Sequence, residues 1–136
     1  MAIATSDGAA YRTSVRSGDL QLVANTLKNG VGGTDGFRPH DLLEAALAAC
    51  MNITARMAAA KAGVALEGVT TSVVLSREGH GPVTFQCSLS ISGELSEEAR
   101  AAVVRAVADC PVRRTLSRGI QFTFDSTARE GLEASR

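Results

Sequence analysis

The stretch that decides the fold is RPHDLLEAALAACMNITARMAAAKAG, residues 38–63. Pro39 suits the first turn of a helix, because the missing N–H would have no partner there anyway, and Gly63 is a stop signal. Apolar and small side chains cover well over half of the circumference around the middle of this segment. A helix that is apolar on nearly all sides has to be buried on most of them. We therefore predict a long central helix over residues 39–62, which a second subunit helps to cover.

Strand and helix signals flank this central helix on both sides. The predicted elements, in chain order, are strands at 11–17 and 20–25, a glycine-rich loop at 26–37, strands at 67–78 and 83–92, helices at 97–108 and 111–117, and a strand at 120–125. This order predicts an α+β fold in which strands pack on the long helix. We expect a single domain over residues 1–136, with a frayed polar tail at 126–136.

The composition excludes several classes of protein. The 136 residues carry 14 basic and 14 acidic side chains, for a net charge of +0, and only 4% are aromatic. A nucleic-acid binder that works by bulk electrostatics would show a basic excess, and a base-stacking platform would need more rings. The longest purely apolar run, residues 45–51, is far shorter than the roughly 20 residues of a membrane span. We therefore expect no nucleic-acid partner and no membrane.

The cellular compartment determines the redox state that we expect for the three cysteines. Residues 1–14 show no charged region followed by an apolar stretch and a cleavage site, so we expect a cytoplasmic protein. In that compartment Cys50, Cys87 and Cys110 would be reduced at rest, and any disulfide between them would be transient.

The local sequence gives each cysteine a different character. Cys50 lies in the middle of the predicted helix, where a free cysteine by itself is more often a small buried hydrophobe than a nucleophile. Cys110 precedes Pro111 and would be the N-cap of a short helix, whose partial positive charge favours a thiolate; a plain helix junction is the equal alternative. Cys87 alternates with polar residues in its strand, and we expect it to face the core together with Phe85 and Leu89.

Other kinds of site have little support. Neither C-x-x-C nor H-x-x-x-H spacing occurs, so we expect no metal site. The glycines of residues 30–36 lack the strand-to-helix context of a phosphate-binding loop, and we expect no bound cofactor. Asp41 and Glu44 fall in the first turns of the long helix, where acidic side chains complement the helix dipole.

Two segments carry a resemblance to a known family. Residues 38–57, RPHDLLEAALAACMNITARM, resemble the P-x-x-L-L-x-A-A-x-x-A-C helix of the OsmC/Ohr family, the osmotically inducible and organic hydroperoxide resistance proteins. Residues 109–120, DCPVRRTLSRGI, resemble the C-P-V-x-x-T-L segment of the same family, and the glycine loop GVGGTDGF also fits. The resemblance implies an OsmC-like α+β fold and an intertwined homodimer with two active sites at the subunit interface.

The resemblance also implies a chemistry. Characterised members reduce organic hydroperoxides with a cysteine pair and an external dithiol. By position, Cys50 looks like the peroxidatic residue, which becomes a sulfenic acid, and Cys110 looks like the resolving residue, which forms a disulfide with it. This assignment reverses the ranking from local electrostatics, in which Cys110 is the more acidic thiol.

The sequence departs from the peroxidase branch at two positions. His40 stands where the family's N-P-E-x-L motif has a glutamate that orients an activating arginine, and Asp41 is the neighbouring acid. The candidates for that arginine are Arg12, Arg16 and Arg38. We assign supporting roles at the site to Arg12 and His40. An alternative function follows from these departures: an OsmC-like member without efficient peroxidase activity that binds a small apolar ligand or acts as a redox sensor.

Overall fold

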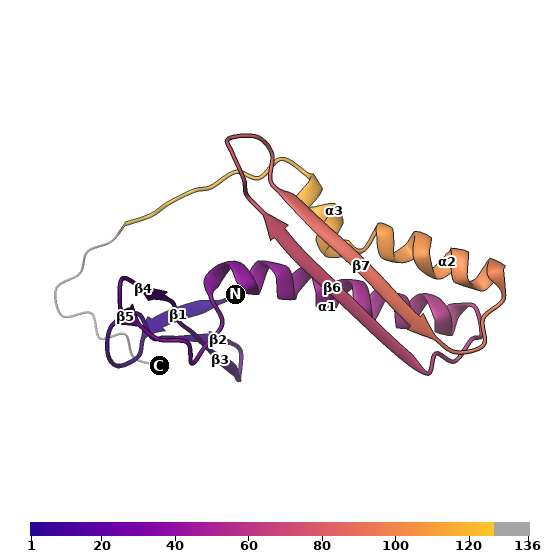
Figure 1. The fold of residues 1–136 in the computed structure, drawn as a ribbon, viewed down its shortest axis with the longest axis horizontal. Coiled ribbons are helices and arrows are strands. Elements are labelled where there is room, and N and C mark those ends of the chain that lie inside the picture. Colours follow the sequence, from indigo (N-terminus) through magenta and orange to yellow (C-terminus); the bar gives the residue numbers. More distant parts are fainter. Residues whose placement is uncertain (127–136) are drawn as a thin grey trace. The chain divides into compact units, whose positions relative to one another are not determined.

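The computed structural model describes residues 1–126 of the chain, and its contacts gather in two compact units. The first unit comprises Met1–Pro39 together with the chain from Ile120, and the second comprises His40–Gly119 (Figure 1). Helices and antiparallel strands both occur, as the α+β prediction requires. The single domain remains a prediction, and the predicted frayed tail lies, apart from Ser126, outside the described residues.

The first unit is built on a three-stranded antiparallel sheet in the order β1-β2-β3. The strands of this unit are β1 (Ile3–Ser6), β2 (Thr13–Ser17), β3 (Leu20–Ala24) and the short pair β4 (Leu27–Lys28) and β5 (Val31–Gly32). The β2–β3 hairpin confirms the predicted pair of segments, and its turn uses Gly18 at φ +58°. Strand β1 was missed because its four residues are all exposed and show no apolar alternation.

The glycine-rich segment is more ordered than a plain loop, since β4 and β5 form a small hairpin within it. Gly32 has φ +100°, and a Cβ at this position would lie 1.8 Å from the carbonyl oxygen of Thr26. Only glycine fits so close an approach of two backbone segments. Asn25, which is buried, closes the segment by accepting the Thr26 N–H at 2.8 Å and donating to Asp35 at 2.6 Å.

The second unit packs three helices against a β-hairpin (Figure 1). Its elements are α1 (Pro39–Lys61, which begins at the last residue of the first unit), β6 (Gly68–Ser76), β7 (Thr84–Ser92), α2 (Glu97–Ala108) and α3 (Pro111–Ser117). The boundaries of α1 confirm the predicted central helix to within one residue. The core combines α1, α2 and the start of α3 through Leu47, Met51, Ala55, Ala59, Val103, Val107 and Cys110.

Three hydrogen bonds attach α1 to β6. The Leu75 N–H donates to Glu44 Oε2 at 2.8 Å, and the Thr71 hydroxyl donates to the Ala48 carbonyl at 2.7 Å. One turn further, the Asn52 amide donates to the carbonyl of Val69 at 3.1 Å. The three helix positions are four residues apart and therefore share one face of α1. Glu44 thus holds the strand rather than only complementing the helix dipole.

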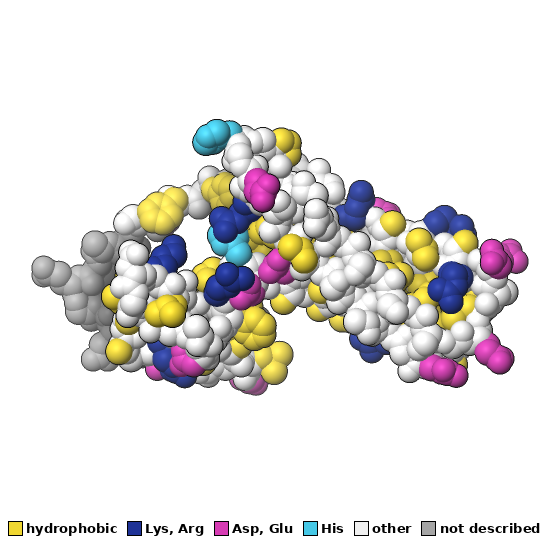
Figure 2. Space-filling model, in the orientation of Figure 1, with side chains coloured by type: hydrophobic (Ala, Val, Ile, Leu, Met, Phe, Trp, Pro, Cys, Tyr) yellow, Lys and Arg dark blue, Asp and Glu magenta, His cyan; other side chains and the backbone are white. Residues whose placement is uncertain are grey.

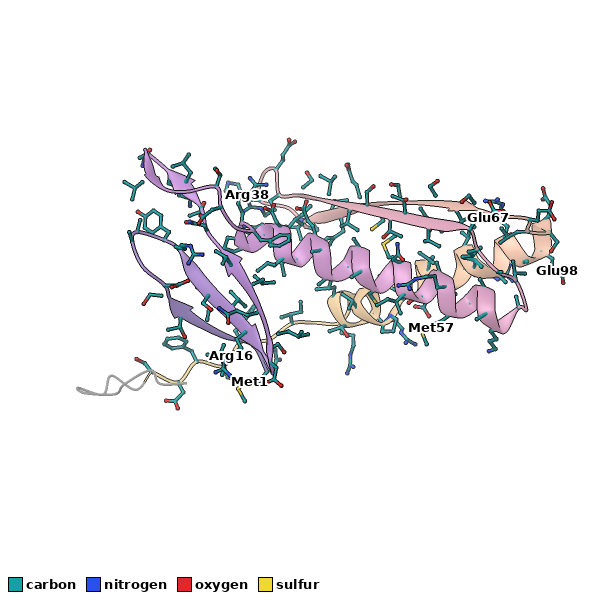
Figure 3. All side chains as sticks on the ribbon, turned by 90° about the horizontal axis from the view of Figure 1, so that it is seen from below. Met1, Arg16, Arg38, Met57, Glu67 and Glu98 are labelled. Atoms are coloured by element: carbon teal, nitrogen blue, oxygen red, sulfur yellow. The ribbon has the colours of Figure 1, made fainter. Side chains whose placement is uncertain are left out.

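The opposite side of α1 carries exposed apolar side chains in the part of the chain that the structure describes. Leu43, Ile53 and Met57 are 45%, 49% and 67% exposed, and Met57 projects away from the β6–β7 hairpin (Figure 3). Among the described residues, α1 is the one helix whose length and composition would allow it to cross a membrane. A core helix passes the same test, and four of its side chains are buried in the second unit.

The predicted strand at 120–125 is wrong. These residues are extended but pair with no strand of the chain as far as the structure describes it. Their alternation of apolar and polar residues suggested a half-buried strand, yet Phe122 and Phe124 are 91% and 92% exposed. The pattern was typical of a strand, but residues 1–126 of one chain offer it no neighbour.

Candidate functional site

The structure places the thiols of Cys50 and Cys110 next to each other, although they are 60 positions apart in the sequence. Cys50 lies in the middle of α1 and is half-buried, while Cys110 is the N-cap of α3 and has no exposed surface. The two thiols are close enough to influence each other, and the Val112 N–H donates to Cys50 Sγ at 3.4 Å. Two thiols in contact can exchange between the reduced pair and a disulfide.

The Val112 amide was not anticipated from the sequence. Val112 follows Pro111 at the second position of α3, and N–H groups in the first turn of a helix have no partner within that helix. Here that free donor is directed at the Cys50 sulfur. The signal was present in Pro111 at the helix start, but the partner could not be read from the sequence.

The expectation that the start of α3 favours a thiolate at Cys110 is wrong. Burial is the largest effect and raises the pKa of Cys110 above its ordinary value. The Arg113 amide comes next and lowers it, the neighbouring Cys50 raises it, and the Val112 amide lowers it least. The Cys110 side chain also makes no capping hydrogen bond to the start of α3. Desolvation of the charged form therefore outweighs the helix terminus. Cys110 is held as a neutral thiol, which suits a resolving residue better than a peroxidatic one.

Cys87 also differs from its prediction. It shares one face of β7 with Phe85 and Leu89, as its alternation indicated, but its side chain is exposed rather than buried in the core. Its thiol donates a long hydrogen bond to the Phe85 carbonyl, with a sulfur–oxygen distance of 3.6 Å.

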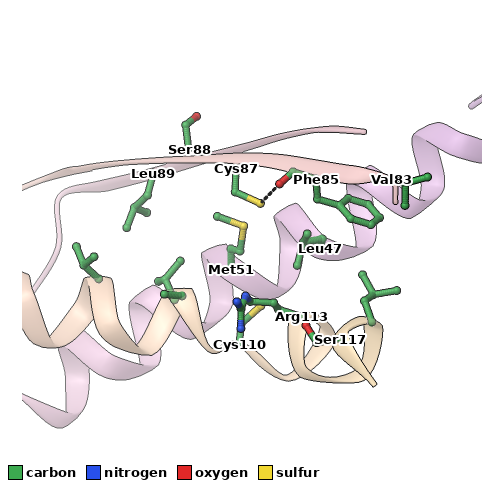
Figure 4. Close-up of a pocket in the computed structure, with 14 residues that line it drawn as sticks. Leu47, Met51, Val83, Phe85, Cys87, Ser88, Leu89, Cys110, Arg113 and Ser117 are labelled. Carbon is green, nitrogen blue, oxygen red and sulfur yellow. Dashed lines mark hydrogen bonds between the residues drawn. The ribbon is translucent and has the colours of Figure 1, made fainter. Parts of the chain in front are cut away.

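A pocket of about 580 Å³ lies within the second unit, beside the cysteine pair (Figure 4). Its walls come from α1, β7, α2 and α3, and their lining residues are Leu47, Met51, Val83, Phe85, Cys87, Ser88, Leu89, Val104, Val107, Ala108, Cys110, Arg113, Leu116 and Ser117. The lining is mainly apolar, with Arg113 as its one charged side chain. Cys110 borders this pocket and Cys50 does not. The pocket is of a size that accommodates small organic molecules.

The sequence prediction gives His40 and Arg12 supporting roles, and they belong to different units of the structure. His40 is exposed in the first turn of α1, and ten residues of continuous helix put it about 15 Å along the axis from Cys50. Arg12 belongs to the first unit, where it forms ion pairs with Asp7 and with Asp35, the latter at 3.0 Å from Nε to Oδ2. Within one chain, therefore, His40 does not contact Cys50, and the roles of both residues remain predictions.

In the first unit, Arg12 pairs with Asp7 and Asp35, and Asn25 donates a hydrogen bond to the same Asp35. Hydrogen bonds from Asn25 and Arg12 lower the pKa of Asp35, which keeps this carboxylate charged beside the guanidinium. Arg16 and Arg38, the other candidates, also interact with neighbouring groups. In residues 1–126 no group of three or more His, Cys, Asp or Glu side chains could hold a metal ion.

Comparison with known proteins identifies the family. The model of the OsmC-like protein family matches residues 32–125, which include all three cysteines and all three helices. The chain belongs to the OsmC-like protein family. A search of curated proteins found no significant match.

Solved structures with this OsmC-like fold come from several bacteria. An OsmC-like protein from Mycoplasma pneumoniae is 21% identical with a TM-score of 0.67, over 85% of this chain and 84% of that one. An organic hydroperoxide resistance protein OsmC from Legionella pneumophila is 25% identical with a TM-score of 0.60, over 86% and 88%. A candidate organic hydroperoxide resistance protein from Vibrio cholerae, with captopril bound in one of its active sites, is 26% identical with a TM-score of 0.59, over 86% and 84%.

Proposed function

We propose that this OsmC-like protein reduces organic hydroperoxides, with Cys50 as the peroxidatic and Cys110 as the resolving residue. The observation that carries the proposal is the contact between the two thiols, with the Val112 N–H directed at Cys50 Sγ at 3.4 Å. Solved relatives with 25% and 26% identity are named as organic hydroperoxide resistance proteins, which supports the same substrate class.

The reaction divides into three steps that balance. The Cys50 thiolate attacks the terminal peroxide oxygen, the O–O bond breaks, and Cys50 becomes a sulfenic acid. The alkoxide that leaves takes a proton from water and becomes an alcohol. The Cys110 sulfur then attacks the Cys50 sulfur, a disulfide forms, and the hydroxyl leaves as water with the proton that Cys110 carried. An external dithiol supplies two electrons and returns both cysteines to thiols.

The geometry suits each of these steps. The Val112 amide stabilises negative charge on Cys50, both before the attack and when the thiolate is regenerated. Burial raises the pKa of Cys110, so this residue keeps the proton that the departing hydroxyl of the sulfenic acid requires. No bound cofactor or metal enters the scheme. We place the reaction in the cytoplasm, where dithiol reductants are maintained.

Consumption of cumene hydroperoxide with dithiothreitol as electron donor tests the proposal. Wild-type protein and the Cys87→Ser variant should turn over many equivalents, whereas Cys50→Ser should lose turnover almost completely. Cys110→Ser should react once with peroxide and stop as a sulfenic acid that a dimedone probe labels on Cys50. Wild-type turnover no faster than that of Cys50→Ser would refute the proposal.

We also propose that the protein works as a homodimer with α1 at its interface. Leu43, Ile53 and Met57 form an exposed apolar stripe at intervals of ten and four residues along α1, and Cys50 lies on the same stripe, seven residues after Leu43. A second copy would cover this stripe and exclude water from Cys50. Basic and acidic side chains are interspersed on the face that Figure 2 shows.

The pocket favours a second candidate function, the binding of a small apolar ligand without peroxide chemistry. About 580 Å³ of mainly apolar space is available beside Cys110. Saturable binding of an apolar fluorescent probe, weakened by Leu89→Asp and accompanied by no peroxide turnover, would favour this candidate. Fast turnover that depends on Cys50 would favour the peroxidase.

A further inference from the structure

The two sulfurs of the cysteine pair differ in their surroundings, and this difference bears on how the disulfide is reduced. Cys110 borders the pocket of the second unit, while Cys50 does not. The Val112 N–H donates to the sulfur of Cys50, whereas the side chain of Cys110 makes no capping bond to the same helix. A thiol that reduces the disulfide has to attack one of these two sulfurs and displace the other.

We propose that the reducing thiol enters through this pocket and attacks the sulfur of Cys110, so that Cys50 leaves as the thiolate. This inference rests on the proposed peroxidase function and concerns the direction of its last step. The thiolate of a dithiol forms a new S–S bond to Cys110 as the Cys50–Cys110 bond breaks. The second thiol of the reductant then attacks the reductant's own sulfur in the mixed disulfide, and Cys110 departs and takes up a proton.

The leaving group supports this direction. In thiol–disulfide exchange the sulfur that is better stabilised as a thiolate leaves faster. The Val112 amide is already placed to stabilise the Cys50 thiolate, while burial raises the pKa of Cys110 and makes it the poorer leaving group. Exposure alone would favour attack on Cys50, which is half-buried against a fully buried Cys110. On the proposed dimer, however, a second copy covers the stripe that contains Cys50.

The pocket provides the route to Cys110. Figure 4 shows Met51 between Cys87 on β7 and Cys110 at the start of α3, with Arg113 beside Cys110 on α3. Arg113 is an exposed residue and lines the same pocket as Cys110. Its positive charge also attracts the thiolate form of an incoming reductant.

A trapping experiment in a Cys87→Ser background decides between the two sulfurs. The protein is oxidised to the Cys50–Cys110 disulfide with diamide, mixed briefly with 2-mercaptoethanol, quenched at low pH and alkylated. Peptide mass spectrometry should find mercaptoethanol on Cys110 and the alkyl group on Cys50. Mercaptoethanol on Cys50 would overturn this inference and leave the peroxidase proposal intact, because diamide forms the disulfide without peroxide. Failure to form the disulfide at all would overturn both.

A variant that fills the pocket tests the route separately. Val104 on α2 is 47% exposed and lines the pocket, whereas Val74 on β6 is 55% exposed and does not. Val104→Trp should slow the reduction of the disulfide by dithiothreitol at least ten-fold and leave its formation by cumene hydroperoxide unchanged. The matched control Val74→Trp should alter neither rate. Equal reduction rates in the two variants would show that the thiol does not pass through the pocket.

Discussion

The backbone N–H of Val112 donates a hydrogen bond to the sulfur of Cys50 at 3.4 Å, across 62 positions of sequence. This contact ties the first turn of α3 to the middle of α1. The two cysteines differ in their surroundings, because Cys50 is half-buried and accepts this bond, while Cys110 is fully buried and makes no capping bond. The donor that is directed at the Cys50 sulfur is therefore a backbone group of the second unit.

Removal of this donor should slow the peroxide step. Val112→Pro deletes the N–H at a first-turn position that tolerates proline. The rate of Cys50 oxidation by cumene hydroperoxide should fall about ten-fold, since a hydrogen bond to a charged group contributes about 1.5 kcal/mol or more. Val112→Ala keeps the N–H and should react like wild type in stopped-flow measurements. Equal rates for the proline and alanine variants, with unchanged circular dichroism, would argue against a role for the amide.

The raised pKa of Cys110 should make stability depend on alkaline pH. The folded protein keeps the Cys110 proton at a pH where the unfolded chain, with an ordinary pKa of about 8.5, has lost it. This contribution to stability is complete below that ordinary value and disappears as the pH rises above it. In urea unfolding with reductant present, wild type should lose more stability between pH 7 and pH 10 than Cys110→Ser. Parallel losses would contradict the assignment.

Glu44 should matter for stability through its carboxylate oxygen. Glu44→Ala leaves the Leu75 N–H of β6 without its acceptor and should cost about 1–3 kcal/mol in the free energy of unfolding. Glu44→Gln retains an acceptor at the same place and should cost clearly less. Chemical denaturation of the two variants checks this, and an alanine variant as stable as the glutamine variant would show that the bond contributes little.

Gly32 should be intolerant of any side chain. A Cβ at this position would lie 1.8 Å from the Thr26 carbonyl oxygen, and φ is +100°. Gly32→Ala should therefore destabilise the first unit by at least about 1–3 kcal/mol. A Cβ on Gly81 would have no atom within 4 Å, and Gly81→Ala should stay within about 0.5 kcal/mol of wild type. Thermal unfolding of both variants measures the difference.

The apolar stripe on α1 should decide the oligomeric state. Met57 is 67% exposed in the single chain, and Met57→Glu would place a charge in the proposed interface. Analytical ultracentrifugation should show a dimer for wild type and a monomer for this variant at the same micromolar concentration. Val74→Glu, on the outer face of β6, is the matched control and should stay dimeric. A monomeric wild type would contradict the proposed dimer.

Several elements were predictable because their signals are local. Pro39 and Gly63 bracket α1, Ser96 accepts the Ala99 N–H at 3.1 Å as the N-cap of α2, and Pro111 begins α3. Each signal acts within one turn of helix, so the sequence alone suffices to find it. The short strand β1 and the misassigned strand at 120–125 show the opposite case. A strand forms only where a neighbouring strand pairs with it, and the residues of a strand do not by themselves specify that neighbour.

The candidate site also has features that local sequence determines and features that depend on tertiary packing. By itself, the sequence determined a mid-helix cysteine, a second cysteine before a proline at a helix start, and the family resemblance that pairs them. Only the tertiary structure decided that Cys110 is buried enough for its pKa to rise, and that Cys87 is exposed at a pocket. It also placed the Val112 amide on Cys50. Capping and helix dipoles act over neighbouring residues, whereas desolvation and contacts across 62 positions depend on how the helices pack.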